Sequence, residues 1–345
     1  MANFPERMLS ILNDGMLCLM TSIGHRTGLF DAMSRMEPAT SQEIAKAAKL
    51  NERYVREWLG GMVTGRIVEY DAATGKYRLP PEHAAVLTRA AGIDNLSMLA
   101  QYIALMGNVE DRIVECFRRG GGVPYSAYPK FQELQAEETA RVFDARLVDQ
   151  ILPLTGMADR LREGVDVLDV GCGGGHGINL MARAFPKSRF YGYDISRDGI
   201  AAARAEAKKM KLANAHFKIA DAAKLEDKSR FDLITAFDTI HDQAKPAKVL
   251  KGISRALRKD GVFLMADIAA SSNLHENMEN PLAPTLYTIS TMHCMTVSLA
   301  YGGDGLGTVW GRQKALEMLS QAGFGNVEIK NIDGDIFNHY YIARK

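Results

Sequence analysis

The sequence predicts a doubly wound, mainly parallel α/β sheet that follows a smaller and mostly helical N-terminal domain. Three observations support this prediction. In the second half of the chain, short apolar runs alternate with segments of helical spacing. A cluster of glycines joins the first of these runs to the first of these helices. Near the N-terminus, two helical segments precede a hairpin pattern.

The first predicted domain, residues 1–92, has the pattern of a helix pair followed by a β-hairpin. Thr40 and Glu43 form a capping box at the start of the first helix of the pair. Residues 51–59 follow as the second helix, and residues 67–79 have the pattern of two strands joined by a turn. A helix-turn-helix followed by a hairpin is a winged helix.

The charge of this domain bears on its role, because a winged helix that reads DNA needs a basic stripe. Residues 1–90 hold eleven basic and ten acidic side chains, a net charge of +1. We therefore expect a dimerisation domain, in which pairing of two copies buries apolar side chains such as Met16, Leu19, Met20 and Trp58. The alternative is a ligand-sensing regulator that binds DNA, and the charge balance argues against it.

The second half of the chain begins with a strand, a glycine turn and a helix. Residues 165–170 are apolar and β-branched, as in a buried parallel strand. Four of the next five residues are glycines, Gly171 and Gly173 among them, and residues 178–185 have helical spacing. Glycine lets the backbone turn sharply and brings its amides close to a ligand at the helix start.

Acidic residues recur where each following strand is predicted to end. Asp169 lies inside the first strand, Asp194 ends the strand 189–194, and Asp221 ends a third run. Residues 231–237 form a fourth strand. This series resembles the class I S-adenosylmethionine-dependent methyltransferases over residues 161–345. The resemblance implies a Rossmann-like sheet closed by an antiparallel strand pair at residues 326–332 and 340–344.

The resemblance also implies roles for individual residues. The loop at Gly171 and Gly173 would pack on the amino-acid part of S-adenosylmethionine, with Asp169 near its ammonium group. Asp194 would accept hydrogen bonds from the ribose hydroxyls. The remaining expected cofactor contacts lie on the adenine side or at the end of the fourth strand, and they are Ile195, Asp221, Ala222 and Phe237.

Two alternatives compete with these roles. A dehydrogenase would explain the glycine turn and Asp194, but it would not explain Asp221 followed by Ala222. A strand-end aspartate can also cap a helix, and this interpretation stays open for Asp221.

Residues 93–160 are predicted to form a helical linker that carries a substrate lid. The stretch 120–128 combines three glycines, a proline and two tyrosines, which suits a loop that folds over a ligand. A plain helix break is the alternative interpretation. Within this region we expect Tyr125 and Phe143 to contact the substrate.

His241 and Asp242 follow the fourth strand, at the sheet edge where ligands bind in open α/β folds. The pair resembles the His-Asp pair of plant-type small-molecule O-methyltransferases, which implies that His241 is the general base. Gln243 stands where that family usually has an aromatic residue. This departure leaves the substrate class open.

The whole layout also resembles the bacterial α-keto acid C-methyltransferases, which hold a ferric ion with two histidines. That resemblance implies His241 and His293 as the metal ligands, with the ion stabilising an enolate. A histidine inside an apolar helix, such as His293, can instead be a hydrogen-bonded core residue.

Composition restricts partners and compartment. The net charge of the chain is +1, so we expect no bulk attraction to nucleic acid or membrane. The four cysteines form no CxxC pair, and no signal peptide pattern is present, so we expect reduced thiols and a cytoplasmic protein. The expected partners are a small-molecule substrate, S-adenosylmethionine and a second copy of the chain. The alternative, metal-dependent function would add iron.

Overall fold

The computed structural model describes residues 3–345, and the chain divides into two compact units, residues 1–108 and 109–345. The boundary falls inside the region 93–160 that was expected to form a linker. Each unit has its own buried core. Among the described residues, no helix combines the length and apolar character needed to cross a membrane.

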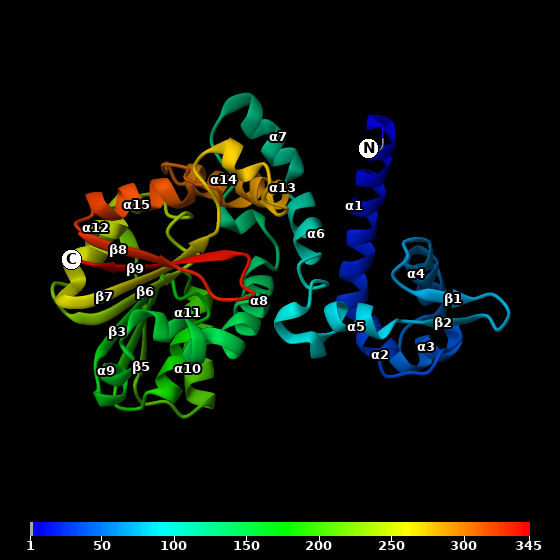
Figure 1. The fold of residues 1–345 in the computed structure, drawn as a ribbon, viewed down its shortest axis with the longest axis horizontal. Coiled ribbons are helices and arrows are strands. Elements are labelled where there is room, and N and C mark those ends of the chain that lie inside the picture. The colour runs from blue at the N-terminus through cyan, green and yellow to red at the C-terminus, as the bar shows by residue number, and fades with distance from the viewer. Residues whose placement is uncertain (1–2) are drawn as a thin grey trace. The chain divides into compact units, whose positions relative to one another are not determined.

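The first unit contains the expected helix pair and hairpin (Figure 1). Trp58, which was expected to be buried by pairing, is instead buried in the core of this unit, where its indole packs edge-on against Phe30 and donates a hydrogen bond to the backbone of Met20. Gly24 lies against both rings, and a Cβ atom there would come within 2.6 Å of each. The elements are α1 Phe4–Thr27, α2 Leu29–Met33, α3 Ser41–Ala48, α4 Glu52–Thr64, β1 Glu69–Asp71, β2 Lys76–Arg78, α5 Pro81–Leu87, η1 Arg89–Asp94 and α6 Gln101–Gly107.

The second helix of the pair, α4, neutralises its own basic residues. Arg53 forms an ion pair with Glu57, and Arg56 lies 3.4 Å from Glu52. In the hairpin, Arg78 pairs with Glu69 at 2.6 Å. These three bases of α4 and the hairpin are thus paired with acids.

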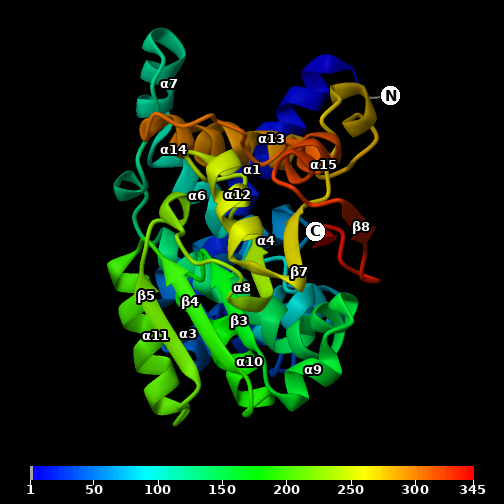
Figure 2. The same cartoon turned by 90° about the vertical axis from the view of Figure 1, so that its left-hand side faces the viewer.

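The second unit is built on a seven-stranded sheet in the order β5-β4-β3-β6-β7-β9-β8. β3 to β7 are parallel, and β9 runs antiparallel to both β7 and β8. The predicted Rossmann-like sheet with a closing antiparallel pair is confirmed. Figure 1 shows β8 and β9 beside β7, and Figure 2 shows β5, β4 and β3 in a row. The strands are β3 Asp166–Val170, β4 Arg189–Asp194, β5 Ala215–Ile219, β6 Phe231–Phe237, β7 Leu257–Ile268, β8 Asn326–Lys330 and β9 Asn338–Arg344.

Helices cover both faces of this sheet. The core on one face includes side chains of α12 and α15, and the core on the other includes those of α9 and α10. The helical elements are α7 Glu110–Arg119, η2 Tyr125–Ala127, α8 Phe131–Arg146, η3 Leu147–Ile151, η4 Leu152–Thr155, α9 Ala158–Glu163, α10 His176–Ala184, α11 Arg197–Lys209, η5 Ala222–Lys224, α12 Pro246–Ala256, η6 Leu274–Asn277, α13 Ala283–Ile289, η7 Ser290–Cys294, α14 Met295–Ala300 and α15 Gly311–Gln321.

The parallel strands all end at one edge, which we call the carboxyl edge: the last residues of β3 to β7 and the segments that follow them. β9 runs antiparallel, so its first residue, Asn338, pairs with Ile268 at this same edge. Open α/β sheets bind ligands here. The sheet order therefore brings together residues that lie far apart in the sequence.

Candidate active site

The glycine turn after β3 begins at Gly171, where close contacts admit no side chain. Gly171 has φ 77°, and a Cβ atom there would lie 2.1 Å from Oγ1 of Thr239. The amides of Gly171 and Cys172 both donate to the carbonyl oxygen of Tyr193, at 2.8 and 3.2 Å. Because α10 starts immediately after the turn, its free N–H groups lie at the carboxyl edge.

Asp194, at the end of β4, bonds to the glycine turn. Its Oδ2 accepts a hydrogen bond from the amide of Gly173 at 2.8 Å, and its Oδ1 accepts one from the amide of Ser196 at 2.7 Å. The neighbouring Ile195 is 70% exposed. Asp194 is thus bonded to the glycine turn and is followed in the chain by an exposed apolar side chain.

Asp221 makes the helix cap that was kept as an alternative. Its Oδ1 accepts a hydrogen bond from the amide of Ala223 at 2.9 Å, and Lys224 lies 3.4 Å from its Oδ2. Ala222 is the first residue of the short helix η5. A local role therefore already accounts for this carboxylate.

Asp169 is a buried acid inside β3. Thr235 of the adjacent strand β6 donates a hydrogen bond to its Oδ1 at 2.8 Å. Burial raises the pKa of Asp169 to about 7, although the Thr235 bond acts in the opposite direction. A carboxyl group in this state becomes a strong acceptor when a cation binds beside it.

His241 is 3% exposed and lies between two acids. Its Nδ1 donates to Oδ1 of Asp267 at 2.8 Å, and its Nε2 lies 3.3 Å from Oδ1 of Asp242. Asp267 Oδ1 also accepts from the indole of Trp310 at 2.9 Å and from the amide of Ile268. Burial lowers the pKa of His241, but the charges of Asp267 and Asp242 outweigh burial and hold it well above its usual value.

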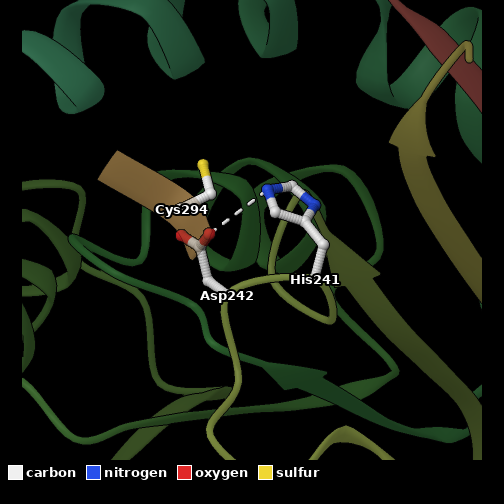
Figure 3. Close-up of side chains that lie close together, drawn as sticks. All are labelled: His241, Asp242 and Cys294. Atoms are coloured by element: carbon white, nitrogen blue, oxygen red, sulfur yellow. Dashed lines mark ion pairs between the residues drawn. The ribbon is translucent and has the colours of Figure 1, made fainter. Parts of the chain in front are cut away.

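Cys294 completes a compact group with His241 and Asp242 (Figure 3). One ligand-type atom from each residue lies within 4.8 Å of the others. Burial raises the pKa of the Cys294 thiol to about 11. Asp242 Oδ1 is buried and has no aligned hydrogen-bond donor. A nitrogen, an oxygen and a sulfur therefore converge at the end of β6.

His293 lies in an aromatic surrounding next to this group. Its ring stacks on Phe131 at 4.1 Å between centroids, and Tyr125 and Tyr128 approach it edge-on at 5.6 and 4.8 Å. Burial lowers its pKa, and its Nε2 has no hydrogen-bond partner. The Tyr125 hydroxyl donates to Oδ2 of Asp242 at 3.3 Å.

The glycine-rich stretch before Tyr125 is fastened to α14. The amide of Val123 donates to the Thr296 hydroxyl at 3.0 Å. A Cβ atom at Gly122 would lie 1.9 Å from the Thr296 carbonyl oxygen, so glycine allows the two backbones to meet. The stretch therefore holds Tyr125 beside Asp242, whether or not it opens as a lid.

A second aromatic contact lies between α8 and the end of β6. Phe143 and Phe237 pack edge-on with centroids 4.9 Å apart. Phe143 also lies against Gly177, where a Cβ atom would come within 2.7 Å of its ring. These two expected ligand-contacting residues thus meet at the carboxyl edge.

The sequence analysis missed two members of the site. Asp267, near the end of β7, was assigned no role, although the strand-end argument that selected the other acids applies to it as well. Cys294 offered no signal, because its position beside His241 depends on the fold of a segment more than fifty residues further along the chain.

Comparison with protein families agrees with this architecture. Residues 15–89 match the model of the Rv2258c-like winged helix-turn-helix domain, and residues 161–323 match a methyltransferase domain model. The chain is a winged helix-turn-helix domain followed by a methyltransferase domain.

Solved structures share the whole fold. Human N-acetylserotonin methyltransferase, solved in complex with S-adenosylmethionine, is 16% identical, with a TM-score of 0.71, 99% of this chain covered and 98% of that one. Mitomycin 7-O-methyltransferase is also 16% identical, with a TM-score of 0.71, 99% of this chain covered and 98% of that one. At this identity the likeness shows the fold alone.

Curated relatives match over a shorter stretch. The ubiquinone biosynthesis O-methyltransferase of Pelagibacter ubique is 31% identical over 111 residues, 32% of this chain and 45% of that protein. The fatty-acid O-methyltransferase of Mycolicibacterium smegmatis is 35% identical over 107 residues, 30% and 38% of the two chains. The chain thus spans less than half the length of these two relatives.

Proposed function

We propose that the protein transfers a methyl group from S-adenosylmethionine to a small-molecule acceptor. The observation that supports this most directly is the adjacency of two groups at the carboxyl edge: the glycine turn bonded to Asp194, and the buried His241 at the end of β6. The names of the structural neighbours and of the curated relatives point to the same reaction class.

The residues of the first group fit this cofactor. Asp169 would pair with its ammonium group, Asp194 would accept from the ribose hydroxyls, and the exposed Ile195 would pack on the adenine. When bound, S-adenosylmethionine supplies an electrophilic methyl group on its sulfonium. Asp221 would contribute less than Asp194, because it already caps η5.

His241 is the proposed general base. Its Nδ1 is engaged by Asp267, and its Nε2, which lies 3.3 Å from Asp242 Oδ1, would take the proton of an acceptor hydroxyl. The raised pKa makes the imidazole a stronger base, but it lowers the fraction of the neutral form near pH 7. Methyl transfer should therefore rise with pH until His241 is neutral.

A metal-assisted reaction is the second candidate. Asp242 Oδ1 and His293 Nε2 are buried without hydrogen-bond partners, and the carboxylate of Asp267 orients His241 as carboxylates often orient metal-bound histidines. His241 and His293, or His241 with Asp242 and Cys294, would hold iron. The ion would bind the two oxygens of an α-keto acid and stabilise its enolate.

We further propose that the first unit pairs two copies of the chain and binds no specific duplex DNA. α1 carries an apolar stripe that is exposed in the single chain: Phe4 is 74% exposed, Leu12 58% and Met16 65%. Burial of such a stripe favours association. Light scattering should give a dimer that Leu12→Glu converts to a monomer, and a monomeric wild-type protein at micromolar concentration would contradict this.

The reaction is tested by following a labelled methyl group. The purified protein is incubated with methyl-labelled S-adenosylmethionine and metabolite extracts, and products are identified by mass spectrometry. We expect a labelled small molecule that is absent with His241→Ala. Label found only in nucleic acid or protein, or in no product while cofactor binds, would contradict the proposal.

A further inference from the structure

One corner of the carboxyl edge holds acidic and amide oxygens that bond to no donor. It consists of Asp238, Asp267 and Asn338, which stand at the neighbouring ends of β6, β7 and β9, and we call it the acceptor corner. Oδ1 of Asp238, Oδ2 of Asp267 and Oδ1 of Asn338 are all buried and have no hydrogen-bond partner. A buried polar atom left without a partner destabilises a fold, so such atoms in one place require an explanation.

The three strands bring these residues together. The amide of Asp238 donates to the carbonyl oxygen of Ala266 at 3.0 Å, which places Asp238 next to the end of β7. Asn338 pairs with Ile268 across the β7–β9 ladder. Asp267 is fully buried, and of all charged groups it acts most strongly on Asp238.

Asp238 is also held in an unfavourable backbone conformation. Its φ is +48°, a region that residues other than glycine rarely adopt. Phe237, Asp238 and Thr239 keep partial exposure, whereas the preceding strand residues and Ile240 are buried. The three residues are therefore partly open to solvent; Phe237 packs on Phe143, and His241 follows two residues after Thr239.

The electrostatic surroundings of Asp238 are mainly negative. Burial, and next the charge of Asp267, raise its pKa well above the usual value; Glu138 and Asp335 act in the same direction, and His241 opposes them. Arg146 lies 3.9 Å from Asp335, whose oxygens already accept from backbone amides and from the Tyr340 hydroxyl. The corner thus offers acceptors and suits a ligand that donates hydrogen bonds and carries positive charge.

From this geometry we infer that the methyl acceptor carries a protonated amine, which Asp238 receives beside His241, with Asp267 and Asn338 as the neighbouring acceptors. The inference rests on the proposed function and specifies its substrate class. A carboxylate in the same position would face the unpartnered oxygens of Asp238 and Asp267. The inference therefore disfavours anionic acceptors such as α-keto acids at this corner.

Three probes that share a phenyl ring test the inference: 2-phenylethylamine, 2-phenylethanol and 3-phenylpropionate. Each is titrated calorimetrically into the full-length protein saturated with S-adenosylhomocysteine, so that the cofactor's own ammonium group is already in place. We expect the amine to bind at least tenfold more tightly than the alcohol and the acid. Equal binding of amine and alcohol, tighter binding of the acid, or no amine binding at millimolar concentration would overturn the inference.

Two variants keep the test independent of folding. Asn tolerates a positive φ and Gly adopts it freely, so Asp238→Asn and Asp238→Gly should melt no lower than the wild type. Both should lose the amine preference and leave alcohol binding unchanged, while Asp159→Asn, at an exposed carboxylate, should change neither. An amine preference that survives in both variants would refute the role of Asp238. Failure of S-adenosylmethionine to bind the wild type would instead refute the proposed function.

Discussion

The two halves of the carboxyl edge differ in how their acids are bonded. In the half formed by β3, β4 and β5, Asp194 and Asp221 accept hydrogen bonds from backbone amides within or beside their own turns. In the half formed by β6, β7 and β9, Asp238 and Asp267 each keep a buried oxygen that has no hydrogen-bond donor, and Asp242 Oδ1 has no aligned donor although His241 Nε2 lies 3.3 Å away. Asp194 and Asp221 are thus already bonded to the backbone, whereas Asp238 and Asp267 have bonding capacity left over.

This difference separates two tasks. A cofactor that many enzymes share can be held by turns whose shape is locally determined, because its groups are always the same. An acceptor specific to one enzyme needs groups that remain unsatisfied until it arrives. We therefore expect substitutions in the two halves to separate cofactor affinity from methyl transfer.

The largest effect is expected for His241→Ala. Removal of the base should slow methyl transfer by about 10²-fold or more, and S-adenosylmethionine affinity should stay nearly constant. Steady-state rates and calorimetry on the same preparation measure both quantities. Normal turnover on the identified acceptor would contradict the proposed role of His241 as the general base.

His293→Ala separates the two roles considered for His241. If His241 acts as a base, His293→Ala should be mild and chelators should have no effect. If it is a metal ligand, both substitutions should be similarly severe, and metal analysis should find about one iron per chain.

In the half formed by β3, β4 and β5, Asp194→Ala should weaken S-adenosylmethionine binding by about 1.5–3 kcal/mol, or roughly ten- to 150-fold, because charge-assisted hydrogen bonds are lost. Asp221→Ala is the matched control, and its effect should be smaller because Asp221 already caps η5. A larger loss of affinity for Asp221→Ala would contradict the expectation that Asp194 contributes more to cofactor binding than Asp221. Calorimetric titration of both variants measures the difference.

Asp267→Asn should change the pH dependence of methyl transfer. Asp267 raises the pKa of His241, so its neutralisation should lower that pKa. The rise of activity with pH, which follows the neutral form of His241, should therefore move to lower pH by about one unit or more. An unchanged pH profile, with Asp242→Asn measured in parallel, would show that Asp267 only supports the fold.

Cofactor affinity should itself depend on pH through Asp169. Its pKa near 7 means that the carboxyl is protonated at low pH and cannot pair with an ammonium group. Binding of S-adenosylmethionine should weaken about tenfold between pH 8 and pH 6. 5′-Methylthioadenosine lacks the amino-acid part, so its affinity should stay constant over this pH range. A tenfold loss of its affinity as well would contradict the pairing of Asp169 with the ammonium group.

The sequence was sufficient for the sheet and for the position of Asp194 at the end of β4. Glycines, apolar runs and strand-end acids are local signals, and the strands β4 and β6 match their predicted bounds. Asp194 was predicted from the same signals, and its bond to Gly173 involves only adjacent turns.

The second half could not be predicted to the same extent, because its geometry depends on contacts between distant segments. Asp267 acquires its role from His241 and Trp310, and Cys294 reaches His241 through a π-helix that interrupts the segment predicted as one helix. The positive φ of Asp238 has no local sequence signal such as glycine. These features arise only when strands that are distant in the sequence lie side by side in the folded chain.

The division of the carboxyl edge is tested most directly by titrating S-adenosylmethionine into the wild type, Asp194→Ala and His241→Ala in one calorimetric series. We predict one S-adenosylmethionine site per chain, equal affinity for the wild type and His241→Ala, and at least tenfold weaker binding by Asp194→Ala. Binding of NAD in place of S-adenosylmethionine, or an equal loss of affinity in both variants, would contradict it.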